Sequence, residues 1–207
     1  MLGSRTGRVE AILSLALLLV GSSASAASTA FTLTPFTFSG DPVELTITLD
    51  DGVVAGSVEL TATVSSGIGD IRGIFFDLVD DAVLAGLSVT GSDVNNENVL
   101  IGSVINMGRG SNLNGGGTPC PCDVGVEIGR PGMGKDDIQT TVLWISHSTL
   151  SLDLSDFADQ SFGGRVTSTG RDREGSSKLE GVVPEPGTGL LLAFGVVGLA
   201  LRPRVLR

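Results

Sequence analysis

Adjacent acidic residues occur at three points of the sequence, and carboxylates in such pairs are suited to bind a divalent cation. The pairs are Asp50-Asp51, Asp80-Asp81 and Asp136-Asp137. Ca²⁺ takes about six to eight oxygen ligands from carboxylates, carbonyl groups and water. The sequence contains no EF-hand loop, and acids at the ends of strands are commonly solvated turn residues. We therefore expect no resident cofactor and keep Ca²⁺ at these pairs as the alternative.

The two cysteines, Cys120 and Cys122, stand on either side of Pro121. Two thiols are too few for the usual zinc sites, and their spacing is shorter than in a Cys-x-x-Cys redox motif. In an oxidising compartment, neighbouring cysteines form disulfides. The spacing predicts a local Cys120–Cys122 disulfide, and a bridge to another chain is the alternative.

Two patterns resemble catalytic motifs but lack essential parts. Residues 129–135 (GRPGMGK) have the spacing of a phosphate-binding loop, yet Asp136 follows where Mg²⁺ requires Ser or Thr. The single histidine, His147, lies between Ser146 and Ser148 in a predicted strand, whose adjacent side chains point to opposite faces. We therefore predict a turn at the first pattern, no Ser-His triad at the second, and a protein that is not an enzyme. An extracellular hydrolase that uses paired carboxylates is kept as a further alternative.

Charge is distributed unevenly along the 207 residues. Of the 23 acidic and 13 basic residues, two acids and five arginines lie outside residues 27–183. The middle part therefore holds 21 acids and 8 bases, a net charge of −13. Because such a surface repels phosphate backbones, we expect no nucleic-acid partner.

Alternating apolar and polar residues predict strands in this middle part, which is rich in Gly, Thr, Ser and Val and lacks Tyr. Residues 43–50 (VELTITLD) alternate throughout, and residues 57–65 repeat the pattern after a turn, which predicts an antiparallel hairpin. Further strands are predicted at residues 31–38, 71–79, 99–105, 124–128, 138–146 and 162–169.

The strand count and the length define the expected fold. About eight strands without helical periodicity, in 157 residues, predict an all-β fold with a single antiparallel β-sandwich of jelly-roll-like or Ig-like type. Residues 106–122 form a long Gly- and Asn-rich loop. Residues 150–157 fit either two helical turns or a strand and a turn. The polar residues 168–183 are predicted to form a linker.

The N-terminus has the three parts of a secretory signal peptide. Arg5 and Arg8 form a basic region, residues 11–20 are apolar except for Ser14, and residues 24–26 (ASA) are small. The apolar run is shorter than the roughly 20 residues of a spanning helix. We predict a signal helix over residues 1–26, cleaved after Ala26, and a chain exported by the general secretion machinery.

The C-terminus also has three parts in a fixed order. Pro184 and Pro186 hold the chain extended and present Glu185 between them, residues 188–201 are apolar without charge, and arginines follow. The 16 uncharged residues 186–201 would cover about 24 Å as a helix, against an apolar bilayer core of about 30 Å. Because arginines tend to stay cytoplasmic, this predicts a hydrophobic membrane helix with the preceding domain outside the membrane.

This tail resembles the PEP-CTERM family, in which a Pro-Glu-Pro motif, a short membrane helix and a basic end form a sorting signal that an exosortase recognises. The resemblance covers residues 183–207, with Pro203 interrupting the basic end. It implies that Pro184, Glu185 and Pro186 are the sorting motif, that residues 187–201 cross the membrane transiently, and that Arg202, Arg204 and Arg207 are the basic stop. It further implies surface display, often in bacteria that make extracellular polysaccharide.

The sequence thus predicts a signal peptide (1–26), a β-sandwich ectodomain (27–167), a polar linker (168–183) and a sorting tail (184–207). The precursor is expected at the inner membrane and the product at the cell surface or outside the cell. The expected role is structural or adhesive and not catalytic. A calcium-assisted glycan-binding module is the alternative, ahead of the hydrolase.

Overall fold

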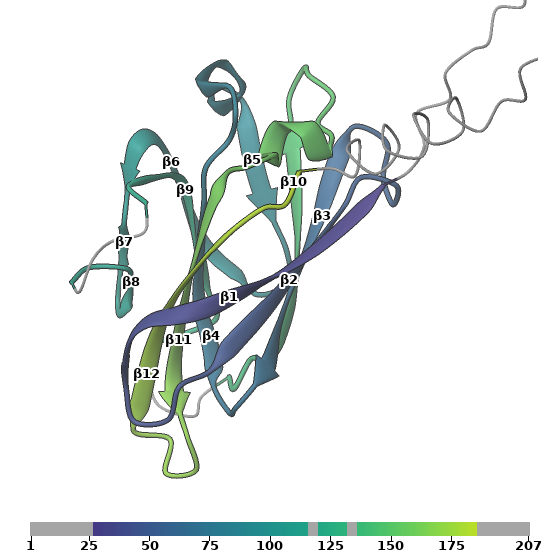
Figure 1. The fold of residues 1–207 in the computed structure, drawn as a ribbon. Coiled ribbons are helices and arrows are strands. Elements are labelled where there is room, and N and C mark those ends of the chain that lie inside the picture. Colours follow the sequence, from purple (N-terminus) through teal and green to yellow (C-terminus); the bar gives the residue numbers. More distant parts are fainter. Residues whose placement is uncertain (1–26, 116–119, 132–135, 186–207) are drawn as a thin grey trace, which may run out of the picture.

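The computed structural model describes residues 27–115, 120–131 and 136–185. These residues form an all-β fold, in which ten strands make one antiparallel sheet in the order β5-β10-β3-β2-β1-β12-β11-β4-β9-β6 (Figure 1). A small hairpin, β7-β8, lies beside this sheet. The strands are β1 (Ser28–Ser39), β2 (Glu44–Asp50), β3 (Ser57–Ser66), β4 (Asp70–Phe76), β5 (Leu87–Thr90), β6 (Val94–Val104), β7 (Asn106–Gly108), β8 (Ser111–Asn112), β9 (Cys122–Ile128), β10 (Thr140–His147), β11 (Ser161–Thr169) and β12 (Gly175–Val182).

Strand β1 belongs to both halves of the large sheet. Its first part pairs with β2, from Ser28 to Leu33, and its second part pairs with β12, from Thr34 to Ser39. The register shifts just after Pro35, which has no N–H to donate to a neighbouring strand. The sheet therefore continues through β1, and its two halves face each other across one core. The predicted fold is corrected in this respect, because a sandwich of the expected types has two separate sheets.

The core follows from the alternation seen in the sequence. On β2, Leu45, Ile47 and Leu49 are fully buried, while the residues between them are only partly buried. Phe162 on β11 lies at the centre of an aromatic cluster, with ring centroids 5.1 Å from Phe31 and 5.4 Å from Phe76. These contacts join residues from both halves of the sheet, so the two halves share one hydrophobic core.

Strands β4 and β9 do not alternate, because both of their faces are covered and every residue in them is buried. One face contributes to the main core. On the other face, Phe75, Cys120 and Cys122 pack against Val104 of β6 and Leu113, which follows the β7-β8 hairpin. The hairpin therefore covers the outside of the sheet here, within what the sequence indicates only as a long loop.

All eight predicted strands are confirmed, and the predicted 43–50/57–65 hairpin is β2-β3. The predicted linker is wrong over Gly175–Val182, because these residues form β12 between β1 and β11, inside the sheet. Residues 150–157 contain a short 3-10 helix, Leu154–Phe157, and a second one spans Asp81–Leu84. No helix in the described part of the chain is long and apolar enough to cross a membrane. The predicted signal helix and the tail helix lie outside the described residues.

Strands β5 and β6 are the two edges of the sheet and are bridged by one side chain. The Glu97 carboxylate on β6 accepts a hydrogen bond from the backbone N–H of Val89 on β5 and lies 3.5 Å from the Ser88 hydroxyl. Exposed edges offer unpaired backbone groups to other chains. Glu97 on one edge strand accepts the Val89 N–H of the other edge strand. This contact brings the two edges together, so the sheet is nearly closed.

The strand register defines two ends of the molecule, which we call the tail pole and the far pole. Ala27 donates a hydrogen bond to Asp51, and Val182 pairs with Ser161, so both ends of the described chain lie at the tail pole. The connections β1-β2, β5-β6, β9-β10 and β11-β12 lie at the opposite end, the far pole (Figure 1). A site built from these connections is as distant from the tail as the fold allows.

Candidate functional site

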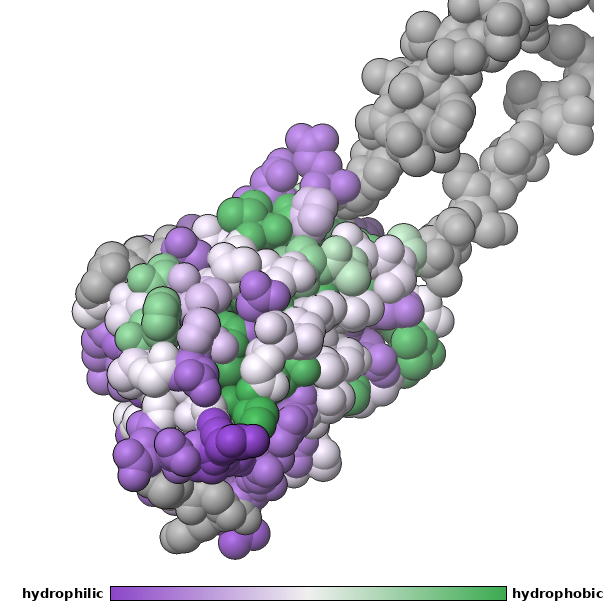
Figure 2. Space-filling view, turned by 60° about the horizontal axis from the view of Figure 1, so that its bottom comes forward, coloured by the Kyte–Doolittle hydropathy of each residue, from purple (hydrophilic) through white to green (hydrophobic). Residues whose placement is uncertain are grey.

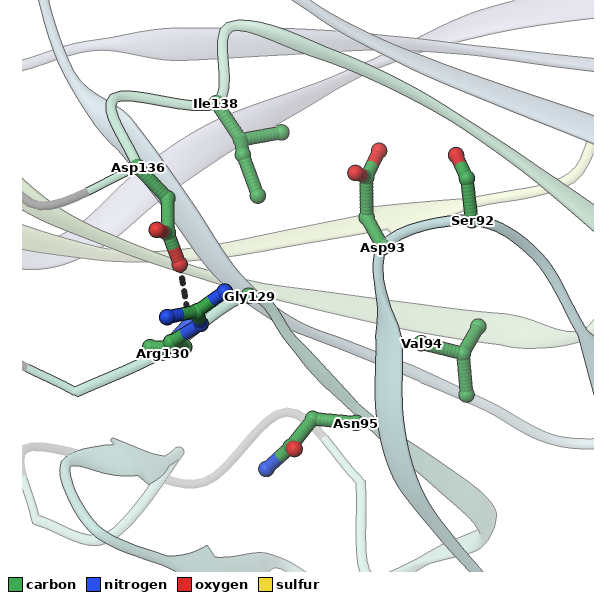
Figure 3. Close-up of a pocket in the computed structure, with 8 residues that line it drawn as sticks. All are labelled: Ser92, Asp93, Val94, Asn95, Gly129, Arg130, Asp136 and Ile138. Atoms are coloured by element: carbon green, nitrogen blue, oxygen red, sulfur yellow. Dashed lines mark hydrogen bonds between the residues drawn. The ribbon is translucent and has the colours of Figure 1, made fainter.

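A polar pocket with a volume of about 410 Å³ opens at the far pole. Two segments form its walls. The β5-β6 connection contributes Ser92 and Asp93 and the start of β6 contributes Asn95, while the β9-β10 connection contributes Arg130 and Asp136. Figure 3 shows the first group on one side and Arg130 with Asp136 on the other. The pocket thus offers hydroxyl, amide, carboxylate and guanidinium groups to one ligand.

Hydrogen bonds hold the two walls in place. The N–H of Gly129 donates to the carbonyl oxygen of Asp93 at 2.8 Å, which ties one connection to the other. Oδ2 of Asp93 accepts from the Thr141 hydroxyl at 2.9 Å, and Oδ2 of Asp136 accepts from the Arg130 N–H at 2.5 Å. Both bonds use Oδ2, so the Oδ1 atom of each carboxylate lies outside them.

A buried ion pair lies next to the pocket and holds residues that border it. Nη2 of Arg72 on β4 lies 3.1 Å from Oε1 of Glu127 on β9, and each side chain is only 3% exposed. Arg72 also donates to the carbonyl oxygen of Ile128. The Asn95 amide, which lines the pocket, donates to the other Glu127 oxygen at 3.0 Å. The pair therefore fixes the end of β9 and one of the pocket side chains.

The predicted acidic pairs do not converge. Asp50 and Asp51 lie at the tail pole, where they accept N–H groups of Gly52 and Ala27, and Asp80 caps the helix Asp81–Leu84 by accepting from Ala82. At the far pole, Asp136 lines the pocket, whereas Asp137 forms an ion pair with Arg173. Calcium bound at these pairs stays a prediction, and Asp93 is the pocket carboxylate that the sequence analysis missed.

The two cysteines form a second cluster, at the outer face of β4 and β9. Cys120 and Cys122 are joined by a disulfide, with Cα atoms 4.9 Å apart, and both are buried. A carboxylate oxygen of Asp77 lies within 4.8 Å of both sulfur atoms. This is the one group of three possible metal ligands that the described residues contain, and with the sulfurs bonded to each other it is a disulfide beside a carboxyl group.

Burial raises the pKa of Asp77 to about 6, because the ionised carboxylate loses water. The N–H of Asp123 donates to it and lowers the pKa, whereas the carboxylates of Asp123 and Asp81 raise it. The folded state therefore binds this proton more tightly than the unfolded chain, so the ionised group destabilises the fold. The loss of folding stability caused by the ionised Asp77 is complete above about pH 6 and disappears as the pH falls toward 4.

We predict that Asp77→Asn stabilises the protein at pH 7.5 and has little effect at pH 4, because asparagine keeps the acceptor for Asp123 without the charge. The gain at pH 7.5 should be about 1–2 kcal/mol, allowing for the partial exposure of the group. Urea unfolding of both proteins at several pH values measures the difference. An equal effect of the substitution at pH 4 and 7.5 would contradict the raised pKa.

The two incomplete catalytic patterns have structural roles. The Arg130 N–H, which would face a phosphate, already donates to Asp136, and residues 132–135 lie outside the described residues. The His147 ring lies at the tail pole, where Nδ1 accepts the N–H groups of Thr149 and Leu150 at 3.0 and 2.9 Å and Nε2 lies 3.1 Å from the carbonyl oxygen of Ala85. Both ring nitrogens are therefore engaged with the backbone.

The chain leaves the fold at the tail pole without a spacer. Val183 is buried, donates its N–H to the Gln160 carbonyl at 3.0 Å and accepts from the Asp159 N–H at 3.2 Å. The next two residues, Pro184 and Glu185, are exposed. Pro186, residues 187–201 and the three arginines of the predicted basic stop lie outside the described residues.

Fold and tail together define a folded all-β domain that ends in a short signal segment. Residues 182–205 match the family model of the PEP-CTERM protein-sorting motif, so the C-terminal tail carries this motif. The resemblance seen in the sequence is confirmed. The motif marks an exported protein that an exosortase processes at the membrane. No curated protein and no solved structure matches the chain.

Proposed function

We propose that the folded domain is a non-catalytic structural or adhesive module of the cell surface or the extracellular matrix. The observation that carries this proposal is the position of the polar pocket at the far pole, opposite the sorting tail. While the tail holds one end of the domain at the membrane, the pocket faces away from it. This is the orientation that a surface protein needs to contact extracellular material.

The chemistry of the pocket favours a polyhydroxylated ligand. Ser92, Asn95 and Arg130 have side chains that can donate hydrogen bonds to a ligand, and the carboxylates of Asp93 and Asp136 can accept them. Sugars present donors and acceptors at close spacing, so a wall of mixed polar groups suits them better than it suits an apolar ligand. Extracellular polysaccharide is therefore the partner that we propose.

A calcium-assisted glycan-binding module is the second candidate. It is favoured by the presence of two carboxylates, from Asp93 and Asp136, in the same pocket with Ser92 and Asn95, since Ca²⁺ binds carboxylate, amide and hydroxyl oxygens. In this case the ion would be held between the two walls and the sugar would bind to it. The two candidates differ in whether binding survives removal of Ca²⁺.

The test is a glycan-array measurement with the mature protein isolated from its own cells. We expect binding that Asp136→Asn weakens at least about tenfold, because the variant loses a charged acceptor at the pocket wall. Asp159→Asn is the matched control, since Asp159 is exposed at the tail pole and does not line the pocket. Loss of binding in EDTA selects the calcium-assisted candidate. Turnover of a bound glycan that depends on Asp93 or Asp136 would show that the protein is a hydrolase and would overturn the proposal. Equal binding by the two variants would also overturn it.

A further inference from the structure

Basic residues are scarce in the folded domain, and most of them gather beside one cavity. Arg72, Arg109 and Arg173 line a cavity of about 270 Å³ at the far pole, next to the turn between β11 and β12. Arg165 on β11 pairs with Lys178 on β12. Each lies two residues along the same strand face from a residue that lines the cavity, Thr167 or Ser176. These five residues, which we call the basic groove, are five of the eight Lys and Arg between residues 27 and 183.

The β7-β8 hairpin forms one wall of the basic groove. Nε of Arg165 donates to the carbonyl oxygen of Gly110 at 3.1 Å, and Arg109 precedes Gly110 at the tip of the hairpin. The connection after β8 passes close to Nζ of Lys178 at Gly115. Hydrophilic residues gather over this end of the molecule in Figure 2, which brings it forward. The groove is therefore a fixed feature between a hairpin and the sheet.

Three of the five cations have no acidic partner in the described part of the chain. The ion pairs there join Arg72 to Glu127 and Arg173 to Asp137, which leaves Arg109, Arg165 and Lys178 without one. Burial lowers the pKa of Arg165, and burial together with the charge of Arg165 lowers the pKa of Lys178. The protein thus holds two cations side by side, at a cost in stability that an anion would offset. The cavity beside them also has one carboxylate among its lining residues, that of Glu174.

The groove offers a specific kind of contact. Guanidinium groups bind the planar oxygens of carboxylates and the oxygens of sulfate esters in pairs. The hydroxyls of Thr167, Ser168 and Ser176 line the same cavity and suit the hydroxyl groups of a sugar. We propose that the basic groove binds an acidic saccharide through its carboxylate or sulfate group.

Two observations favour a saccharide over a nucleic acid. The folded domain has a net charge of −13, which repels a dense polyanion approaching over its whole surface. A short acidic saccharide needs only the local groove, and its hydroxyl groups match the hydroxyls of Thr167, Ser168 and Ser176 that line the cavity. The groove is a different site from the pocket around Asp93 and Asp136, because the two share no lining residue. Arg72 is the one groove residue whose ion pair also holds a pocket side chain, so the groove is tested at Arg165 and Lys178.

The test measures binding of the mature protein by titration calorimetry at low ionic strength. The probes are oligogalacturonate, a sulfated dextran oligomer, neutral dextran and a single-stranded oligonucleotide. We expect one or both acidic saccharides to bind, with an affinity that falls as NaCl is added, and neutral dextran not to bind. The two acidic probes distinguish a carboxylate from a sulfate ligand. Equal binding of neutral dextran, binding of the oligonucleotide in place of the saccharides, or no binding of either acidic probe would overturn the proposal.

The variant Arg165→Gln/Lys178→Gln should bind the acidic saccharide at least about tenfold more weakly, because it loses two charged hydrogen-bond donors. Arg171→Gln is the matched control, since Arg171 lies in the same turn region but does not line the cavity. Thermal unfolding without ligand checks the fold, and we expect the double variant to be no less stable than the wild type, because it loses a repulsive pair. Unchanged affinity in the folded double variant contradicts the proposal.

Discussion

Mature protein from wild-type cells is expected to lack the residues after the Pro-Glu-Pro motif, whereas cells without the exosortase should retain them up to Arg207. The physical reason is the exposure of Pro184 and Glu185 immediately after the buried Val183, which leaves the motif accessible at the edge of a rigid domain. The apolar segment that follows is short for a permanent span. Intact-mass measurement of the protein from both strains distinguishes the two forms. Arg207 present in both strains would show that the tail is not processed.

Glu185→Gln should have the same effect within wild-type cells, because it removes the charge of the sorting motif and leaves the domain unchanged. Glu180→Gln is the control, since Glu180 is also an exposed acid near the C-terminus but lies on β12, before the motif. We expect an uncleaved tail in the first variant and normal processing in the second. Identical processing of the two variants would mean that Glu185 is not recognised.

Arg72→Met is expected to lower the free energy of unfolding by about 3–5 kcal/mol, the cost of leaving one partner of a buried ion pair without the other. Glu127 would stay buried with only the Asn95 amide as a side-chain partner. The measurement is urea unfolding of the mature protein, followed by the fluorescence of Trp144, the single tryptophan. Because Asn95 and Ile128 depend on the same pair, ligand binding in the adjoining pocket should weaken as well.

Arg173→Met provides the comparison, since it removes the other ion pair. The side chains of Arg173 and Asp137 are 22% and 47% exposed, so its loss should cost only about 0–1 kcal/mol. The double variant Arg72→Met/Glu127→Met should recover part of the stability lost in Arg72→Met, because no charge stays buried alone. Similar losses in Arg72→Met and Arg173→Met would contradict the importance of the buried pair.

The strands with one buried face were predictable, because alternation in residues such as 43–50 reports burial directly. Strand β12 was not, since its residues GSSKLEGV hold only two large apolar side chains, the buried Leu179 and the exposed Val182. Its inward positions are filled by Ser177 and Leu179 and by close packing around Gly164 and Gly181, which a hydrophobicity pattern does not register. The sequence of a strand that lies between two other strands can therefore resemble the sequence of a linker.

The candidate site was predictable only in part, because its two walls are distant in sequence. Asp136 was singled out as a possible ligand, but its partner across the pocket is Asp93, and the pairing depends on how β6 and β9 are aligned. Arg72 and Glu127 were also missed, although a charged residue within each of the apolar strands β4 and β9 is a signal for a buried pair. The basic groove likewise brings together residues from β4, the β7-β8 hairpin, β11 and β12.

The central place of β12 also decides when the sheet can close. Strand β1 must wait for β12, since Thr34 pairs with Glu180 near the other end of the domain. The sheet therefore cannot be completed until the chain is available almost up to the sorting motif, which begins at residue 182. A chain cut short before β12 would leave the second half of β1 without its partner strand.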